Sequence, residues 1–505
     1  MGRLYAVALS FANLVYLLAW GGLAAQGPQT LWYRKTLPTP QQYAAVAADV
    51  LALSIVTYAV LRVAAKLPPW LRRILLAAAL LAVAFPLLPF AAAHLPFRSP
   101  APRQLAALAA AAALVVVGVI FRCFDWAARA ARKIALAALL SVPVTFAGVG
   151  IAILARPPLA PDPLPAARLP GGPPVRILWL IFDEWDQRLS FTHRLPGTAL
   201  PAIDRLASMS FVGTRALAAE AGRPVGTMST AISMPSLLYS RSVAAAQIVD
   251  TAHMDLVFAD GGRARFGEAP NYFSLARARG WNAAVGGWYL PYCPSFGSQV
   301  SSCYWDQLYD RSDAAGAGFA EASWQETELL VESALLAPFG QRLTAFRHAS
   351  EYKALAGFAR RTAADPGIGV ALVHFNIPHG PYFYNSANGR SDVSASGAAG
   401  YDAALQLVDR TVAEVLEALA RSGLDGKTAL ILSADHPARF PTRIDGGEDV
   451  HVPFIVHLPG GQTGMAFDGE FSALATVPLA LAVAAGEVAT PEAVAKFVTE
   501  RGVRP

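Results

Sequence analysis

The chain has 505 residues, of which 54% are hydrophobic and only 15% are charged, and its formal net charge is +5. So apolar a composition excludes a wholly soluble protein of this size, and it predicts a membrane part and a soluble part in one chain. Much of the Lys and Arg lies in short loops between apolar runs, without a basic tract or zinc-finger spacing, so nucleic acid is not expected as a partner.

The first 156 residues contain five apolar runs, each long enough to cross the hydrocarbon core of a membrane. The runs cover residues 4–25, 43–65, 74–95, 105–121 and 134–154. Lys and Arg are more frequent in the second and fourth connections between the runs than in the first and third. Since positive loops stay in the cytoplasm, the N-terminus is expected there and everything after Leu154 outside. Residues 1–156 are therefore predicted to form a bundle of five transmembrane helices.

A proline- and glycine-rich stretch separates this part from the rest of the chain. Residues 157–174 are expected to form an extended linker, because so much proline and glycine favours neither helix nor sheet. Residues 175–505 suffice for one large α/β domain. Strand-like apolar runs recur there at 175–182, 368–375, 428–433 and 452–458, with helical patterns between them. This alternation predicts a mostly parallel central sheet, with ligands beyond the carboxyl ends of its strands.

Two of the three cysteines, Cys293 and Cys303, stand ten residues apart in the exported domain. Two thiols without a nearby histidine make a poor metal site, and an oxidising compartment favours pairing. We therefore expect a disulfide between them. Cys123 lies at the end of a membrane helix and is expected to be inert.

Metal-capable side chains follow two of the predicted strands. The first strand ends in Asp183 and Glu184, and a later one ends in Asp435 and His436. Parallel strands deliver such residues to the same edge of a sheet. Carboxylates together with a histidine are typical ligands of zinc or a harder divalent cation, so the pattern predicts a site for one divalent metal.

A cluster of small hydroxyl residues follows Gly226 and precedes an apolar helical run. It comprises Thr227, Ser229, Thr230 and Ser233. Alone, such a cluster is typical of an ordinary helix cap. Beside a metal, one of these hydroxyls could act as a nucleophile, with the helix N-terminus receiving an anionic group.

Several stretches carry a family resemblance. They are PAIDRLA at 201–207 with SFVGTRA at 210–216, TAISMP at 230–235, NIPHGP at 376–381, the helix with Tyr401 and Asp409 before ALILSADH, and HVPFI from His451. With them the chain resembles the alkaline phosphatase/sulfatase superfamily. It looks most like the membrane phosphotransferases typified by lipoteichoic acid synthase and lipid A phosphoethanolamine transferase, and the resemblance covers nearly the whole chain.

The resemblance implies roles for individual residues. Thr230 matches the nucleophilic threonine, and Asp435 and His436 match the second metal pair. His379, in the motif that Asn376 opens, matches the substrate-binding histidine, and His451 resembles a further histidine near the phosphate.

The chain also departs from the family pattern. The transferases carry one Glu and the sulfatases paired aspartates where this chain has Asp183 and Glu184, so Glu184 is the first choice as metal ligand and Asp183 the second. Pro437 replaces the usual Gly after the Asp-His pair, and the cysteines beside the nucleophile of the lipid A enzymes are missing. His374 lies within a predicted strand and is expected to be packed.

Taken together, the resemblance implies a metal-dependent phosphotransferase with zinc or manganese as cofactor. It would move a phosphoethanolamine or phosphoglycerol head group from a phospholipid donor, through a phospho-threonine, to an envelope glycan or lipid acceptor. The protein is expected in a bacterial cytoplasmic (inner) membrane as a multi-pass protein, with its catalytic domain in the periplasm or outside the cell. The alternatives are a sulfatase-like hydrolase, either a phosphodiesterase or a sulfatase, and an inactive membrane scaffold. The Ser233-Met-Pro-Ser segment lacks the arginine of a sulfatase nucleophile motif.

Overall fold

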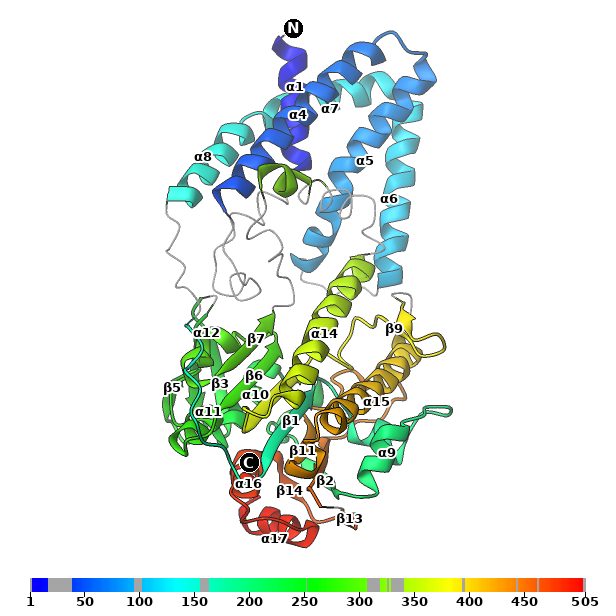
Figure 1. Ribbon diagram of the computed structural model, residues 1–505. Coiled ribbons are helices and arrows are strands. Elements are labelled where there is room, and N and C mark those ends of the chain that lie inside the picture. The colour runs from blue at the N-terminus through cyan, green and yellow to red at the C-terminus, as the bar shows by residue number, and fades with distance from the viewer. Residues whose placement is uncertain are drawn as a thin grey trace. The chain divides into compact units, whose positions relative to one another are not determined.

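The computed structural model describes two compact units of the chain, and each is described by itself (Figure 1). The first contains the described residues up to 154 together with 318–324, 327 and 340, and the second contains those from 163 to 306 and from 341 onward. The described residues are 2–16, 39–94, 102–154, 163–250, 252–306, 318–324, 327, 340–392, 396–441, 444–460 and 463–502.

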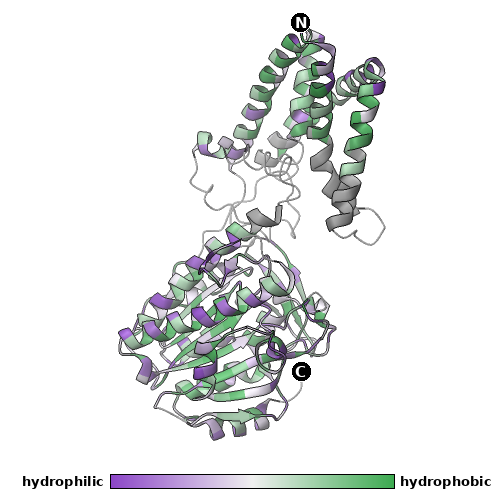
Figure 2. Cartoon of the chain, turned by 90° about the vertical axis from the view of Figure 1, so that its right-hand side faces the viewer, coloured by the Kyte–Doolittle hydropathy of each residue, from purple (hydrophilic) through white to green (hydrophobic). Residues whose placement is uncertain are grey.

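The first unit is helical. Its helices are α1 (Gly2–Val15), α4 (Pro40–Ala64), α5 (Pro69–His94), α6 (Pro102–Arg122), α7 (Phe124–Ala138) and α8 (Ser141–Leu154). Among the described residues, two helical stretches are long and apolar enough to cross a membrane, Pro40–Ala64 and Phe124–Gly148. Hydrophobic residues predominate along these helices (Figure 2). The part of the first predicted run beyond residue 16 lies outside the described residues.

The fifth predicted run, 134–154, is not one uninterrupted helix. α7 ends at Ala138 and α8 begins at Ser141. Pro143 explains the break, since it has no N–H to bond to the carbonyl of Leu139 and its ring would clash with that carbonyl. The Ser141 hydroxyl instead donates to the carbonyl of Ala138 at 2.6 Å.

The second unit is built on a nine-stranded sheet with the order β13-β2-β12-β11-β1-β8-β6-β7, and β14 pairs with β2. All pairs from β11 through β1, β8 and β6 to β7 are parallel, whereas β12 runs antiparallel to both β11 and β2. The mostly parallel sheet is thus confirmed. Its strands are β1 (Arg176–Phe182), β2 (Phe211–Leu217), β6 (Ala283–Trp288), β7 (Ser302–Asp306), β8 (Val370–Phe375), β11 (Thr428–Ala434), β12 (His451–His457), β13 (Met465–Phe467) and β14 (Phe471–Ser472).

The central strand is buried on both faces. Every residue of β1 from Ile177 to Phe182 is buried, and so is the whole of β8 and β11. Since successive side chains point to opposite faces, such a strand must be apolar throughout, which is why it reads as a continuous hydrophobic run. Figure 1 shows α14 and α15 in front of the sheet, and α16 packs against β1 and β11.

The remaining elements are short or lie around the sheet. The helices are α9 (Pro201–Ala207), α10 (Thr230–Tyr239), α11 (Tyr272–Ala278), α12 (Tyr292–Phe296), α14 (Gly340–Ala364), α15 (Gly397–Arg421), α16 (Thr476–Ala484) and α17 (Pro491–Arg501). A small antiparallel sheet holds β3 (Val243–Ile248), β4 (Met254–Phe258) and β5 (Arg263–Arg265), and a hairpin holds β9 (Tyr384–Asn385) and β10 (Arg390–Ser391).

The described end of the predicted linker, residues 163–174, is extended but not free. The N–H of Leu169 donates to Asn282 Oδ1 at 2.8 Å, and Arg168 forms an ion pair with Asp365. This stretch is therefore fastened along the sheet domain, although its composition alone predicts a tether. Residues 157–162 lie outside the described part of the chain.

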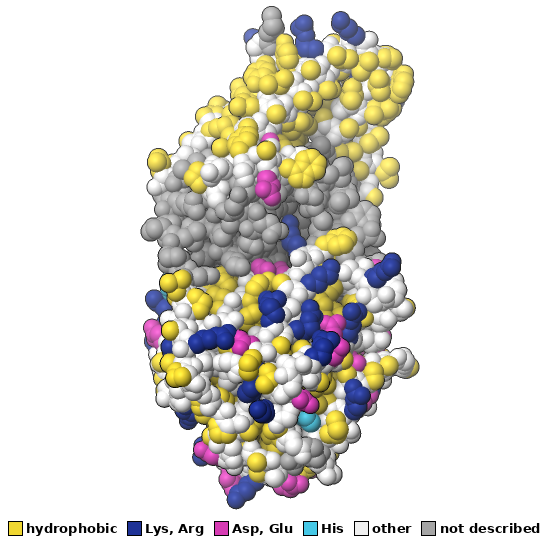
Figure 3. Space-filling model, in the orientation of Figure 1, with side chains coloured by type: hydrophobic (Ala, Val, Ile, Leu, Met, Phe, Trp, Pro, Cys, Tyr) yellow, Lys and Arg dark blue, Asp and Glu magenta, His cyan; other side chains and the backbone are white. Residues whose placement is uncertain are grey.

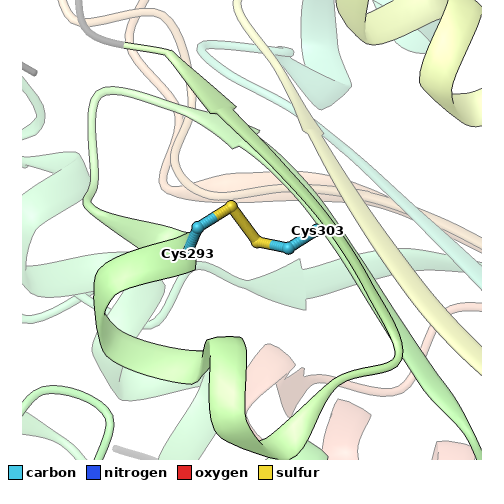
Figure 4. Close-up of a disulfide and its surroundings, with 2 residues drawn as sticks. All are labelled: Cys293 and Cys303. Atoms are coloured by element: carbon cyan, nitrogen blue, oxygen red, sulfur yellow. A yellow bond between two sulfur atoms is a disulfide. The ribbon is translucent and has the colours of Figure 1, made fainter. Parts of the chain in front are cut away.

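The predicted disulfide is present (Figure 4). It joins Cys293 on α12 to Cys303 on β7. The bond ties the connection that follows β6 to the edge strand of the main sheet, so it holds in place the segment that carries Tyr292.

Candidate active site

The site lies at the carboxyl edge of the sheet, where three central strands end side by side. Phe182 of β1 is in register with Phe375 of β8 and with Ala434 of β11. The residues that follow these three positions are Asp183, Asn376 and Asp435. Strands nearly 200 and more than 250 positions along the chain from β1 thus bring their polar ends together.

Asp183, Asp435 and His436 form the one group among the described residues whose arrangement could hold a metal ion. Their ligand atoms lie within 4.8 Å of one another, and all three side chains are buried. Nε2 of His436 is 3.3 Å from Asp435 Oδ2 and 3.8 Å from Asp183 Oδ1. Neither Nε2 of His436 nor Oδ1 of Asp183 has a hydrogen-bond partner among the described residues. Buried, unpaired ligand atoms converging in this way fit a divalent cation.

The electrostatics of the two aspartates also fit a cation. Burial raises the pKa of Asp183 well above its ordinary value, and the negative charge of Asp435 raises it further. For Asp435, burial also acts upward, but His436 and His374 outweigh it and hold the pKa below its ordinary value. Two buried carboxylates in contact repel each other, and a positive ion between them removes that cost.

Thr230 joins this group from α10. Its hydroxyl lies 2.9 Å from Asp435 Oδ2 and 3.2 Å from Asp183 Oδ2, and the residue is only 5% exposed. The helix begins at Thr230 itself, and its N-cap is Ser229, whose hydroxyl accepts from the N–H of Ala231. Within the hydroxyl cluster, the helix cap is therefore Ser229 and not Thr230. Because Ser229 has the extended backbone of an N-cap and makes the capping hydrogen bond, the Thr230 hydroxyl does not cap the helix and contacts the two aspartates instead.

The geometry reverses the order of preference between Glu184 and Asp183. Asp183 belongs to the group around His436, whereas the Glu184 carboxylate pairs with Arg439, whose Nε is 2.6 Å from Oε1. Glu184 has a φ of 65°, a left-handed conformation in which the chain turns sharply after β1. Consecutive side chains on either side of this turn therefore reach different partners. Burial would raise the pKa of Glu184, but His379 and Arg439 pull it below its ordinary value.

Arg439 connects Glu184 to His379. Its Nη2 lies 2.5 Å from Nε2 of His379. Arginine only donates, so Nε2 of His379 accepts, and the ring proton is on Nδ1. That Nδ1 is buried and has no partner among the described residues, and burial lowers the pKa of His379, which keeps the ring neutral. The position of Arg439 four residues after Asp435, in the same loop, was the sequence signal that could have identified it.

His374 is packed, as expected, but it also reaches the site. Its Nε2 lies 3.8 Å from Asp183 Oδ2, and its Nδ1 is hydrogen-bonded to the hydroxyl of Tyr292 at 2.9 Å. Complete burial lowers its pKa to about 4, so the ring is neutral near pH 7. Nothing in the sequence distinguishes this strand histidine from an ordinary core residue, because its role depends on Tyr292, 82 positions away.

Asn376 and His451 have other partners. The amide of Asn376 donates to the carbonyl of His348 and to the carboxylate of Glu351, which fastens the end of β8 to α14. His451 pairs through Nδ1 with Asp449 at 2.6 Å. The contacts described here join neither residue to Asp183 or His436, so their substrate-binding roles remain predictions.

Tyr401 of α15 holds the turn that positions these carboxylates. Its hydroxyl donates to the carbonyl of Glu184 at 2.8 Å and accepts from the N–H of Asp186 at 3.1 Å. We expect Tyr401→Phe to leave both buried backbone groups unpaired and to lower the free energy of unfolding by roughly 1–3 kcal/mol. Chemical denaturation of the purified protein measures this. As a control, Tyr384→Phe in the β9–β10 hairpin should cost less, and an equal loss in both variants would contradict this role for Tyr401.

Comparison with known proteins places the chain in a family. A protein-family model described as Sulfatase matches residues 177–484, more than half of the chain. A search of curated proteins gives no match.

Several solved structures are similar to the chain at low sequence identity. Ps i-CgsB in complex with k-i-k-neocarrahexaose is 15% identical, covering 64% of this chain and 74% of its own, with a TM-score of 0.43. The phosphonate monoester hydrolase of Agrobacterium radiobacter is 15% identical over 66% and 78%, with a TM-score of 0.42. The lipoteichoic acid synthase LtaP of Listeria monocytogenes is 13% identical over 63% and 73%, with a TM-score of 0.38. Likeness at this level does not specify a reaction or a substrate. Because the family model matches residues 177–484, more than half of the chain, the chain belongs to the sulfatase family.

Proposed function

We propose that the protein is a metal-dependent phosphotransferase that carries a phospholipid head group on Thr230. One observation carries the proposal: the Thr230 hydroxyl is held by two buried carboxylates at the start of α10, next to His436. A nucleophile needs a group that takes its proton and a site that accepts the anion it attacks. Members of the superfamily are typically metal-dependent hydrolases or transferases, which supports this reading.

Asp183, Asp435 and His436 are the residues that would hold a divalent ion, zinc or manganese, and Thr230 lies against them. Such an ion would lower the pKa of the Thr230 hydroxyl and neutralise charge on the phosphoryl oxygens. Asp435 Oδ2 accepts the hydrogen of the Thr230 hydroxyl at 2.9 Å, so the oxygen is oriented before substrate arrives.

The reaction has two displacements at phosphorus. In the first, the Thr230 oxygen forms a bond to the phosphorus of the head-group phosphodiester. The bond from phosphorus to the glycerol oxygen breaks, and diacylglycerol leaves with the proton that Thr230 gave up. In the second, an acceptor hydroxyl attacks the phospho-threonine, and its proton returns to the Thr230 oxygen. The ring N–H at Nδ1 of His379, unpaired in the structure, is the donor that we assign to a phosphoryl oxygen.

The intermediate provides the direct test. Full-length protein incubated with phosphatidylethanolamine and, separately, with phosphatidylglycerol should gain mass on the peptide that contains Thr230. An added phosphoethanolamine or phosphoglycerol group identifies the donor by tandem mass spectrometry. If neither donor leaves an adduct while metal is bound, the phosphotransferase proposal fails.

The same assay separates the transferase from a hydrolase. An adduct that decays to a free head group without an acceptor, at the rate seen with one, would indicate a phosphodiesterase. A sulfatase is less well supported, because Thr230 cannot be converted to a formylglycine, and Ser233 lies buried within α10 in a segment without the motif's arginine. A protein that binds neither metal nor head group would be a scaffold.

We also propose that the helical unit is a multi-pass membrane domain and that the sulfatase domain is outside the cytoplasm of a bacterial cell. The stretches Pro40–Ala64 and Phe124–Gly148 and the charge distribution of the loops support this. The topology confines the site to the interface in which a phospholipid donor lies.

A reporter measures this topology. Alkaline phosphatase fused after Pro174 should be active, since it folds only outside the cytoplasm, and green fluorescent protein fused there should be dark after export in unfolded form. The same two reporters fused after Lys66, in the positive second connection, form the matched control and should give the opposite result. Fluorescence from the Pro174 fusion would show that the number of crossings is even.

A further inference from the structure

A groove lies between α14, α15 and the β9–β10 hairpin, separate from Asp183, Asp435 and His436, which are called the acid–histidine group below. It encloses a cavity of about 500 Å³, within the range of roughly 300–1,000 Å³ for ligand sites. Five basic and two acidic side chains line it, together with the half-buried ring of Tyr384 and the buried rings of Tyr352 and Phe383. The charged residues of this basic groove are Lys353, Arg360, Arg390, Arg410, Arg421, Glu414 and Glu417.

The positive charge of the basic groove is only partly neutralised inside it. Glu414 is shared between Arg360 at 2.5 Å and Arg410 at 3.0 Å, and Glu417 pairs with Arg421. Lys353 and Arg390 form no ion pair with any described residue, and both are exposed. In Figure 3, Lys and Arg side chains gather, with a few Asp and Glu among them, over the part of the face where α14 and α15 lie. Five basic groups against two acids leave a site complementary to an anion.

The basic groove and the active site take residues from the same loop. Phe383 and Tyr384 follow His379 in the same loop, so the strand that leaves the site forms one side of the groove. The ring of His348 lies between the two regions, with its centroid 5.9 Å from His379 and 5.7 Å from Phe383. Phe383 in turn packs on Tyr352 at 5.7 Å. The buried rings of His348 and Phe383 thus pack between the groove and His379.

We propose that the basic groove binds an anionic glycan, and that this glycan is the acceptor of the transferred group. The second clause rests on the proposed function, whereas the binding itself does not. Arginine forks pair with the carboxylate or phosphate groups of such a chain, and the half-buried ring of Tyr384 offers an aromatic face to a sugar ring. An acyl chain would need an apolar channel, which the seven charged residues of the lining do not provide.

Binding is measured on full-length protein in neutral detergent, with a fluorescein-labelled heparin hexasaccharide as the anionic probe. Fluorescence anisotropy should show saturable binding that unlabelled hexasaccharide reverses and that neutral maltohexaose does not. Lys353→Glu combined with Arg390→Glu should weaken binding by roughly a hundredfold, about tenfold for each lost charge-assisted contact. Both residues are exposed and have no ion pair, so the variant should fold.

The matched control is Arg205→Glu combined with Lys427→Glu, which makes the same change in net charge outside the basic groove. It should weaken binding no more than about threefold, the scale of a long-range effect between screened charges. Equal weakening in both double variants would show unspecific attraction and overturn the proposal. Displacement of the probe by dihexanoyl phosphatidylglycerol, but not by unlabelled glycan, would assign the groove to a lipid head group instead.

Failure of the glycan proposal and failure of the transferase proposal give different results. The groove variants should still form the Thr230 adduct at the wild-type rate, because no groove residue belongs to the acid–histidine group. If the probe binds but no adduct forms on Thr230, the glycan site is supported and the transferase proposal is contradicted. If the adduct forms but the probe does not bind, the transferase proposal is supported and the glycan site is contradicted.

Discussion

Thr230→Ala is expected to abolish the head-group adduct and to lower the transfer rate by about 10³-fold or more, since covalent catalysis has no substitute once the attacking oxygen is gone. The Thr230 hydroxyl is the one in the 227–233 cluster that contacts both Asp435 and Asp183 in the structure. Transfer of a radiolabelled head group measures the rate. Metal content should be close to that of the wild type, because Asp183, Asp435 and His436 are unchanged.

The neighbouring hydroxyls are the matched controls for Thr230. Ser229 caps α10 and Thr227 donates to the carbonyl of Pro224, so each has a structural role. Ser229→Ala and Thr227→Ala should cost roughly 0.5–2 kcal/mol of stability and leave most of the activity. If either abolished the adduct while Thr230→Ala kept it, the nucleophile would be misassigned. Activity in all three variants would contradict the covalent mechanism.

Asp183→Asn should have the second large effect, on metal binding. The loss of affinity for Zn²⁺ or Mn²⁺ in a calorimetric titration is expected to exceed the roughly 10–100-fold typical of changes outside the ligand sphere. Burial and the negative charge of Asp435 both disfavour the ionised form of Asp183. The metal-free variant should therefore unfold at the same temperature as metal-free wild type or at a higher one, which excludes misfolding as the cause of lost affinity.

Glu184→Gln is the control for this result, because Glu184 carries the same charge one position later and pairs with Arg439. Its effect on metal affinity should fall within or below the 10–100-fold range of outer groups. It should also alter substrate affinity, since Arg439 then loses the carboxylate that holds it beside His379. A greater loss of metal in Glu184→Gln than in Asp183→Asn would restore Glu184 as the ligand.

The helical unit shows which features hydropathy predicts and which it misses. Hydropathy placed runs where α4, α5 and α6 are found, because a run of apolar residues that long is stable only in lipid or in a large core. Hydropathy does not register the break between Ala138 and Ser141, since Pro143 changes backbone hydrogen bonding without changing apolarity.

The central strands and the residues at their ends are predictable from the amino-acid pattern alone. Strands buried on both faces must be apolar throughout, so the polar residues that follow them, Asp183, Asp435 and His436, stand out in the chain. The cysteine pairing followed in the same way from spacing and compartment.

Which of the two adjacent carboxylates lies beside His436 is visible only in the folded chain. That choice depends on the left-handed backbone at Glu184, on Tyr401, which holds the turn, and on Arg439, which pairs with the second carboxylate. These partners are more than 200 positions away, so no local pattern contains the information. The direction of a side chain is set by the charges and hydrogen bonds around it, and those exist only once the strands have come together.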